Sequence, residues 1–309
     1  MIERRTFVWH GVEHPAFEAT GVSEGPKLSL IAGVHGCEYS SIAAVLRFVN
    51  ELDTSELSGT ITAVPVVSME SFRQRSPFVV PADGKNLNRS FPGSREGSYT
   101  DVLARSIYED LIAPADVLVD LHGGDQVEGL EPFAIYEASP VEARAHAIAV
   151  AFNLPYVVRE ERHEGGLGGL TTSAAAEAGI PGVIAEAGGR GLLEESAVQL
   201  LVTGLRNVLR HLEMLPGKLD PPPGAQRQVG SFIWLRSTHE GWWDSAVESG
   251  DEVREGQLLG RIRNLWGDVL EELPAPRDGV ILFITTSPAV ASNGLLLGLG
   301  ADLVVPSRA

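Results

Sequence analysis

Between residues 27 and 212, short apolar runs alternate with longer segments in which apolar residues recur every three or four positions. The short runs predict buried strands, and the longer segments predict amphipathic helices. Strands that alternate with helices indicate a mostly parallel sheet with helices on both faces, so the fold class that we expect is α/β. The expected strands are 28–32, 60–67, 117–121 and 182–186, and the expected helices are 40–52, 102–111, 142–152, 171–179 and 194–212.

The pattern changes after residue 217. Pro221, Pro222 and Pro223 neither continue a helix nor enter a central strand, so they mark the boundary between two predicted domains, 1–217 and 218–309. Beyond them, short apolar segments separated by Gly or Pro turns predict an all-β domain with strands at 231–236, 241–246, 257–262 and 280–285. This domain resembles half of a biotinyl/lipoyl-type sandwich, but no lysine follows Lys218 to carry a lysine-linked cofactor.

Acidic residues outnumber basic ones, with 41 Asp and Glu against 24 Lys and Arg, which gives a net charge of −17. Nucleic acid and anionic membranes attract clustered Lys and Arg, so we expect neither as a partner. The single cysteine, Cys37, excludes an intrachain disulfide and fits a reducing compartment. The N-terminal residues lack the apolar core of a signal peptide, and no run of about 18 apolar residues predicts a membrane span. We therefore expect a cytoplasmic protein, and the sequence is compatible with a homo-oligomer.

Polar residues that suit a metal ion follow the first predicted strand. His35 and Glu38 lie three positions apart where strand gives way to helix, a spacing that brings both side chains to one side. Gly33 and Gly36 allow the backbone to turn sharply there. The alternative is a helix cap, with Glu38 beside the positive end of the helix dipole.

A second polar group follows the strand at 117–121. His122 lies at its end, and Asp120, two residues earlier, points to the same side and is placed to hydrogen-bond an imidazole. The carboxyl ends of parallel strands meet at one edge of a sheet, where open α/β sheets bind their ligands. Two His and one Glu suit a catalytic zinc ion, whereas an ordinary polar pair at a strand end is the alternative for Asp120 and His122.

Two further sets of polar residues are candidates for a substrate site. Asn88 and Arg89 lie in a loop at 82–99, and Arg holds a carboxylate through two parallel hydrogen bonds. These residue types are also common in loops that bind nothing. Glu186 ends the strand at 182–186, where it is a candidate fourth metal ligand, salt-bridge partner or general base.

The order of these motifs resembles the succinylglutamate desuccinylase/aspartoacylase family, which lies within the zinc carboxypeptidase clan. The resemblance covers roughly residues 25–215. It rests on Gly33-x-His35-Gly36-x-Glu38, Asn86-Leu87-Asn88-Arg89, Asp120-Leu121-His122, and Glu186 within Ala185-Glu186-Ala187-Gly188-Gly189.

The resemblance implies a catalytic zinc-carboxypeptidase-like domain with one zinc ion held by His35, Glu38 and His122. It implies that Glu186 is the general base and that Asn88 and Arg89 grip a carboxylate or acyl group of the substrate. An arginine upstream of the loop polarises the scissile carbonyl in this family. Arg73 and Arg75 are the candidates, and the run that leads to Asn86 favours Arg75.

One position departs from the aspartoacylase pattern. Aspartoacylase-like members have Asp where this chain has Asn86, and the form with Asn followed by Phe-Pro-Gly is more similar to the branch of N-acetyl-diaminobutyrate deacetylases. The activity implied is a zinc-dependent deacylase that cleaves the amide bond of a small N-acylated amino acid or related compound. The alternatives are a zinc carboxypeptidase-type peptidase acting on short peptides and a non-catalytic metal-binding protein.

Overall fold

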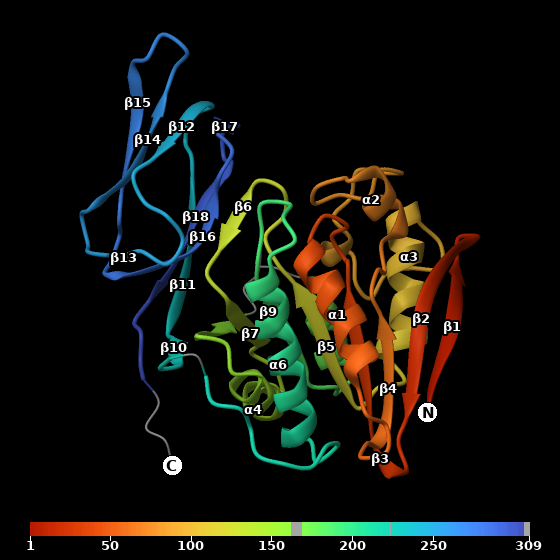
Figure 1. Ribbon diagram of the computed structural model, residues 1–309. Helices are drawn as coiled ribbons and strands as arrows, with labels where there is room; N and C mark the ends of the chain where they lie inside the picture. The colour runs from red at the N-terminus through yellow and green to blue at the C-terminus, as the bar shows by residue number, and fades with distance from the viewer. Residues whose placement is uncertain (162–168, 223, 306–309) are drawn as a thin grey trace.

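A mixed, mostly parallel sheet forms the body of the protein (Figure 1). The fold was obtained as a computed structural model, which describes residues 1–161, 169–222 and 224–305. The sheet has nine strands within these ranges, and β3, β4, β5 and β9 at its centre are parallel to one another. In spatial order the strands are β1 (Ile2–Trp9), β2 (Val12–Thr20), β4 (Ser58–Val64), β3 (Ser23–Ala32), β5 (Val117–His122), β9 (Gly182–Glu186), β7 (Phe133–Glu137), β8 (Tyr156–Glu160) and β10 (Arg227–Val229).

Helices cover both faces of this sheet, as the alternating pattern predicts. One face packs against α1 (Tyr39–Glu51), α4 (Glu142–Phe152) and α6 (Glu195–His211). The other packs against α3 (Tyr99–Ile107), the π-helical turn η2 (Tyr108–Ile112) and α5 (Thr171–Glu177). Two short helices, α2 (Met69–Gln74) and η1 (Leu87–Arg89), lie in the connections. None of the helices in the described ranges has the length and apolar character needed to cross a membrane.

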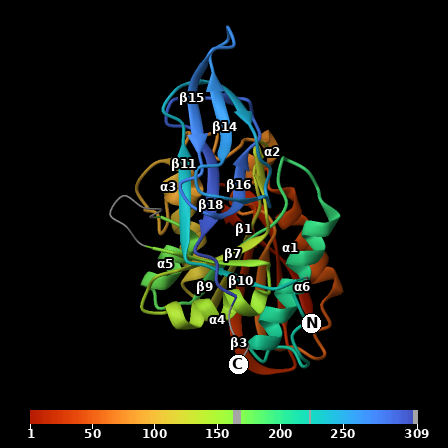
Figure 2. The ribbon, with the colours of Figure 1, turned by 90° about the vertical axis from the view of Figure 1, so that its left-hand side faces the viewer.

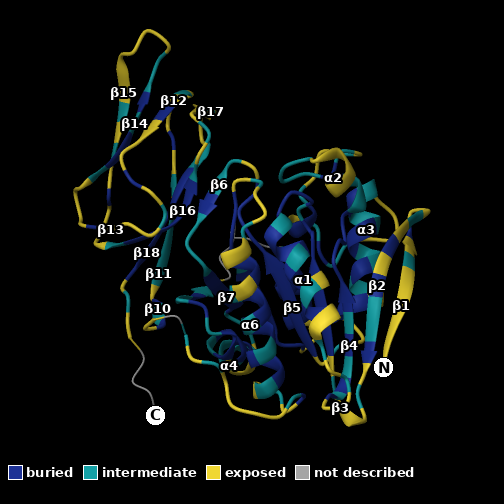
Figure 3. Ribbon diagram, in the orientation of Figure 1, coloured by how far each residue is buried: buried dark blue, intermediate teal, exposed yellow. Residues whose placement is uncertain are grey.

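The central strands are continuous apolar runs because both of their faces are buried (Figure 3). Successive side chains point to opposite faces of a strand. In β3, Leu28 and Leu30 therefore join the core under α1 and α6, whereas Ile31 joins the core under α3 and α5. In β5, Val119 and Leu118 divide in the same way.

The C-terminal part of the chain forms two antiparallel sheets beside the β8–β10 edge of the large sheet (Figure 2). They enclose an apolar core of their own. Within the described residues, the first sheet contains β11 (Ser231–Arg236), β18 (Leu295–Ala301), β16 (Gly279–Thr285), β13 (Glu252–Val253) and β6 (Glu128–Leu130), and the second contains β15 (Val269–Pro274), β14 (Leu258–Arg263), β12 (Gly241–Ser245) and β17 (Ala289–Val290).

The two parts of the molecule exchange strands. β10 follows the proline run but pairs with β8 in the large sheet, and β6 precedes it but pairs with β16 in the C-terminal sheet. A shared apolar cluster that includes Phe133, Val158 and Leu282 fills the contact between them. This seam holds the C-terminal sheets in a fixed place against the large sheet. The division at 217/218 and the likeness to a biotinyl/lipoyl-type sandwich stay predictions.

Several expectations of local structure were incomplete, and β7 and β8 of the large sheet were not predicted. The N-terminal hairpin of β1 and β2 was not predicted, because the exposed side chains of β1 leave it without an apolar run. The helix predicted at 102–111 begins earlier, at Tyr99, where Ser98 and Asp101 form a capping box, and it ends in the π-helical turn η2.

The contact between α4 and α6 depends on a glycine. A Cβ atom on Gly204 would lie 2.0 Å from Cε1 of Phe152, which is buried in the core. Gly204→Ala is therefore expected to lower the free energy of unfolding by about 1–2 kcal/mol, because overpacking outweighs the gain in helix propensity. Urea denaturation would measure this change. The exposed Gln199→Ala in the same helix is the control and should shift stability by less than about 0.5 kcal/mol; equal stabilities of the two variants would contradict the packing argument.

Candidate active site

Three adjacent parallel strands place the predicted site residues at one edge of the sheet. His35 follows β3, His122 ends β5, and Glu186 ends β9 directly opposite His122 in the strand register. The turn after β3 is tight, with a φ of 62° at Gly33. A Cβ atom on Gly36 would lie 2.1 Å from the backbone nitrogen of Phe72, so only glycine lets this loop pack against α2.

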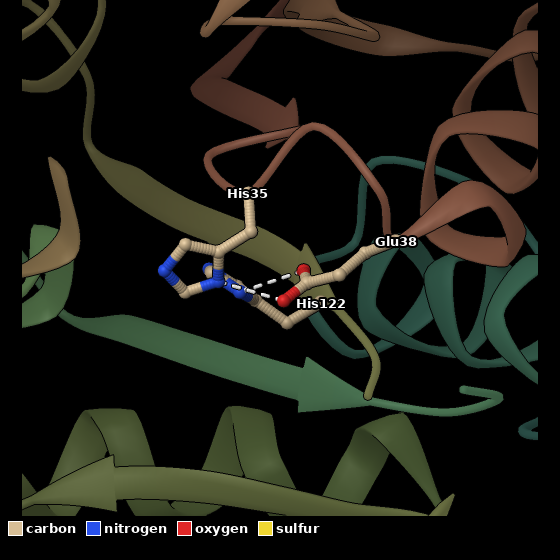
Figure 4. A group of neighbouring side chains, drawn as sticks. All are labelled: His35, Glu38 and His122. Carbon is tan, nitrogen blue, oxygen red and sulfur yellow. Dashed lines mark hydrogen bonds and ion pairs between the residues drawn. The ribbon is translucent and has the colours of Figure 1, made fainter. Parts of the chain in front are cut away.

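Glu38 stands between the two histidines (Figure 4). Its Oε1 lies 2.7 Å from Nδ1 of His35, and its Oε2 lies 3.0 Å from Nδ1 of His122. Glu38 occupies the N-cap position of α1, but its side chain makes no capping hydrogen bond. The carboxylate therefore contacts the two histidines and makes no capping hydrogen bond, although Glu38 does lie at the positive end of the α1 dipole.

The second nitrogen of each imidazole is held by another residue. The Nε2–H of His35 donates to Oδ1 of Asn86 at 3.1 Å, and the Nε2–H of His122 donates to Oδ2 of Asp120 at 3.1 Å. Thr171 Oγ1 donates to the same Asp120 oxygen at 2.5 Å. These contacts set the tautomer of both rings and direct both Nδ1 lone pairs toward Glu38, as in metal sites where a carboxylate orients a histidine.

This arrangement requires a positive charge at its centre. With the protons on Nε2, two Nδ1 lone pairs face two carboxylate oxygens, and such acceptor pairs repel unless a proton or a cation lies between them. Burial lowers the pKa of His122, but the charges of Asp120 and Glu38 outweigh it and raise this pKa well above its usual value. Burial alone would raise the pKa of Glu38, yet the two imidazoles bring it to about 2.

The donor set fits a zinc ion. One ligand atom each from His35, Glu38 and His122 lies within 4.8 Å of the others. The Glu38 and His122 side chains are almost fully buried, at 3% and 2% exposure, and His35 is 13% exposed. Two imidazole nitrogens and one carboxylate oxygen match the three protein ligands of catalytic zinc sites, which keep a fourth position for water or substrate.

Glu186 is separate from this ligand group. Its carboxylate has no hydrogen bond or ion pair with any residue that the structure describes. Burial, together with the nearby charges of Glu38, Glu128 and Asp120, raises the pKa of Glu186 well above its usual value despite the opposing effect of His122. A partly buried carboxylate with a raised pKa holds a proton more readily than an exposed one, which suits a group that accepts and returns protons.

A cavity of about 470 Å³ opens from this cluster, and Asn88 and Arg89 line it. Asn88 is held by the backbone N–H of Thr171, which donates to its Oδ1, so that its Nδ2 faces Nε2 of His122 at 3.5 Å. The guanidinium of Arg89 donates to the carbonyl oxygen of Asn88 at 2.6 Å and forms no ion pair within the described ranges. Desolvation lowers the pKa of Arg89 but leaves it a cation. Arg89 is therefore available to an anionic group in the cavity.

Neither candidate arginine upstream of the loop lines the cavity. Arg75 ends α2 in a left-handed conformation, with a φ of 53°, and its side chain is exposed. Its carbonyl oxygen accepts a hydrogen bond from Gln126, and Phe78, three residues later, does line the cavity. Arg75 thus lies three residues from a lining residue but neither lines the cavity nor joins the cluster. Arg73 is also exposed, and its charge acts on His14 and Tyr99, which are outside the cavity lining.

Sequence reasoning missed several residues of the site. Thr171 anchors both Asp120 and Asn88, although nothing in its sequence context distinguishes it from other helix-terminal threonines. Glu128 lines the cavity, and burial raises its pKa to about 8, so that it is mostly neutral at pH 7. The C-terminal sheets add Phe232 and Trp234 to the wall, from a strand with no chemical motif.

The comparisons with known proteins agree with this geometry. The family model described as succinylglutamate desuccinylase/aspartoacylase catalytic domain matches residues 24–212. N-alpha-acetyl-L-2,4-diaminobutyric acid deacetylase of Halomonas elongata is 30% identical over 292 residues, which are 91% of this chain and 83% of that protein. The chain belongs to the succinylglutamate desuccinylase/aspartoacylase family. The resemblance in the sequence motifs is thereby confirmed.

Solved structures of the family share the fold over nearly the whole chain. A succinylglutamate desuccinylase/aspartoacylase from Rhodobacter sphaeroides is 25% identical with a TM-score of 0.84, and the match covers 99% of this chain and 96% of that one. A product-bound structure of the ectoine utilization protein EutE (DoeB) from Ruegeria pomeroyi is 26% identical with a TM-score of 0.85, covering 97% and 95%. The α/β sheet followed by antiparallel C-terminal sheets is therefore the architecture of this family.

Asp120 provides a test of the metal site. Asp120→Asn keeps the shape of the side chain but removes the charge that orients His122, so zinc affinity should fall about 10- to 100-fold. Competition with a chromophoric chelator measures this affinity. Asp116→Asn is the matched control, because Asp116 precedes the opposite end of β5 and accepts a hydrogen bond from the Lys27 backbone. Equal zinc affinities of Asp120→Asn and Asp116→Asn would contradict the assignment.

Proposed function

We propose that the protein is a zinc-dependent deacylase that hydrolyses the amide bond of a small N-acylated amino acid or related compound. The observation that carries this proposal is the pair of Nδ1 atoms, from His35 and His122, that face the Glu38 carboxylate while their Nε2 atoms are already held. Membership of the family and the similarity to a deacetylase of an acetylated diamino acid support it.

His35, Glu38 and His122 would hold one zinc ion per chain. When bound, zinc supplies a water molecule whose pKa is lowered toward about 7 and a positive charge beside the scissile carbonyl. Asp120 and Asn86 keep the two imidazoles in the ligating tautomer, and the backbone N–H of Gly123 donates to Oε2 of Glu38 at 3.3 Å. The chain thus preorganises the ligands before the ion arrives.

Glu186 is the general base in this proposal. It accepts a proton from the attacking water and passes it to the nitrogen of the departing amine, so one carboxylate serves both halves of the reaction. Its position at the end of β9, beside His122, supports this role. Its lack of partners in the described part of the chain and its raised pKa support it further.

Asn88 and Arg89 bind the substrate, with Arg89 pairing with a carboxylate and Asn88 donating to an acyl or carboxyl oxygen. Both line the cavity close to His122. Arg75 reaches in from the rim and donates to the oxygen that becomes negative as the carbonyl is attacked. The exposed position of Arg75 requires that its side chain turn inward when substrate binds.

The cavity favours a deacylase over a peptidase. Its volume of about 470 Å³ suits a small molecule, and residues of β11, β16 and β17 in the C-terminal sheets form part of its wall. A polypeptide would have to pass these sheets, which the seam with the large sheet holds in place.

Glu186→Gln should abolish turnover without removing the metal. We expect kcat to fall by about 10²- to 10⁴-fold, because the amide cannot accept the proton of the attacking water. Assays of N-acetyl, N-succinyl and N-formyl amino acids with zinc added, together with metal analysis of both proteins, provide the measurement. Loss of zinc from Glu186→Gln would make Glu186 a ligand. A zinc-loaded wild-type protein that hydrolyses none of these amides would refute the deacylase proposal.

The two arginines of the α2 segment make a matched pair. Arg75→Ala should lower kcat by about 10²- to 10³-fold, as loss of one oxyanion donor does in other hydrolases. Arg73→Ala, two residues away and also exposed, should leave kcat within about twofold of the wild-type value. Steady-state kinetics on the best amide of the screen decides between them. An unaltered kcat in Arg75→Ala would remove that residue from the mechanism.

A further inference from the structure

We infer that the substrate carries a bulky apolar group, aromatic or branched aliphatic. This group binds in an apolar subsite, called the bay below, that the large sheet and the C-terminal sheets form jointly. This inference rests on the proposed deacylase function and narrows its substrate class. The residues that line the cavity are of two kinds: the metal ligands, Glu186, Glu128, Glu160 and Arg89 are charged or titratable, whereas most of the others are apolar.

A connected row of aromatic rings forms this wall. The ring of Phe133 in the large sheet lies 5.9 Å from that of Phe232 in β11. Phe232 lies 4.6 Å from Trp234 and Trp234 lies 5.5 Å from Phe283 in β16, measured between ring centroids. All four residues line the cavity, and Leu130 and Ile135 extend the apolar surface between them.

The row is built into the sheet. Gly298 in β18 pairs with both Trp234 and Phe283 across the first C-terminal sheet. A Cβ atom on Gly298 would lie 2.8 Å from Cζ of Phe232 and 3.0 Å from Cβ of Phe283, so glycine makes room for the rings. Phe133 and Phe283 are almost fully buried, whereas Trp234 is 36% exposed and so retains surface for a ligand.

The chemistry of this wall selects against a polar substituent. A carboxylate placed against the rings would lose its hydration without gaining a hydrogen bond, which is unfavourable. An ammonium would exchange its hydration for cation–π contact alone. An aromatic or branched aliphatic group would instead remove from water both its own apolar surface and that of the cavity wall. The ligand therefore combines three features: an amide at the metal cluster, a carboxylate within reach of Arg89, and an apolar group in the bay.

The apolar group belongs either to the amine or to the acyl part of the substrate, and two series of N-acyl amino acids distinguish these cases. N-acetyl-phenylalanine and N-acetyl-leucine carry it on the amine, and N-phenylacetyl-glycine and N-isovaleryl-glycine carry it on the acyl group. N-acetyl-glycine and N-acetyl-2,4-diaminobutyrate are the small and the polar references. We expect kcat/KM for at least one apolar arm to exceed both references about 10-fold or more, chiefly through KM.

Trp234→Ala tests the bay directly. The loss of kcat/KM on the preferred apolar amide should exceed the loss on N-acetyl-glycine by about 10- to 100-fold, since only the former contacts the ring. Trp242→Ala is the matched control, because this tryptophan lies on β12 in the same part of the molecule and is outside the cavity lining. It should reproduce the wild-type preference.

A binding measurement separates this inference from the proposed function. Calorimetric titration of the zinc-loaded, inactive Glu186→Gln protein with N-acetyl-phenylalanine or N-phenylacetyl-glycine should show binding that Trp234→Ala, added to it, weakens about 10-fold and Trp242→Ala does not. If this Trp234-dependent binding is observed but the wild-type protein hydrolyses none of the amides, the deacylase proposal is refuted and the apolar bay is supported. Two results would refute the apolar bay but leave the deacylase proposal intact. One is efficient hydrolysis with N-acetyl-2,4-diaminobutyrate as the preferred substrate, and the other is an equal loss of kcat/KM on all amides in Trp234→Ala.

Discussion

The structure of the site depends on the Glu38 carboxylate, which lies between the inward-facing nitrogens of two imidazoles. Its two oxygens contact Nδ1 of His35 and Nδ1 of His122 at 2.7 and 3.0 Å. Because the opposite nitrogens already donate to Asn86 and Asp120, these contacts are stable only with positive charge between them. A buried acidic cluster of this kind would be costly alone, and a bound divalent cation compensates for it.

The sheet explains why these groups meet. β3, β5 and β9 are adjacent and parallel, so the loops at their carboxyl ends open on the same edge, and the residues that would bind metal and transfer protons come from neighbouring strand ends. The C-terminal sheets then limit the space above this edge. β6 and β10 cross between the two parts of the molecule and make the aromatic surface a fixed wall of the cavity.

The sequence was most informative where an apolar run, which predicts a strand, is directly followed by a polar residue of the site. The apolar runs before His35, His122 and Glu186 predicted the strands, and their order predicted a common edge. The contact of Asp120 with His122 followed from strand periodicity and is confirmed. Thr171 and Trp234 were not found, because their roles depend on the packing of distant segments that no local pattern encodes. The exposed position of Arg75 was equally unforeseeable, since it follows from the conformation of one loop.

The central claim is that His35, Glu38 and His122 bind a single divalent cation through Nδ1, a carboxylate oxygen and Nδ1. Anomalous diffraction at the zinc absorption edge, from crystals grown with zinc, tests it most directly. One strong peak per chain is expected within bonding distance of these three atoms, with Nε2 of His122 still hydrogen-bonded to Asp120. A peak bonded to Nε2 of either ring, or no peak at this edge of the sheet, would exclude this metal site.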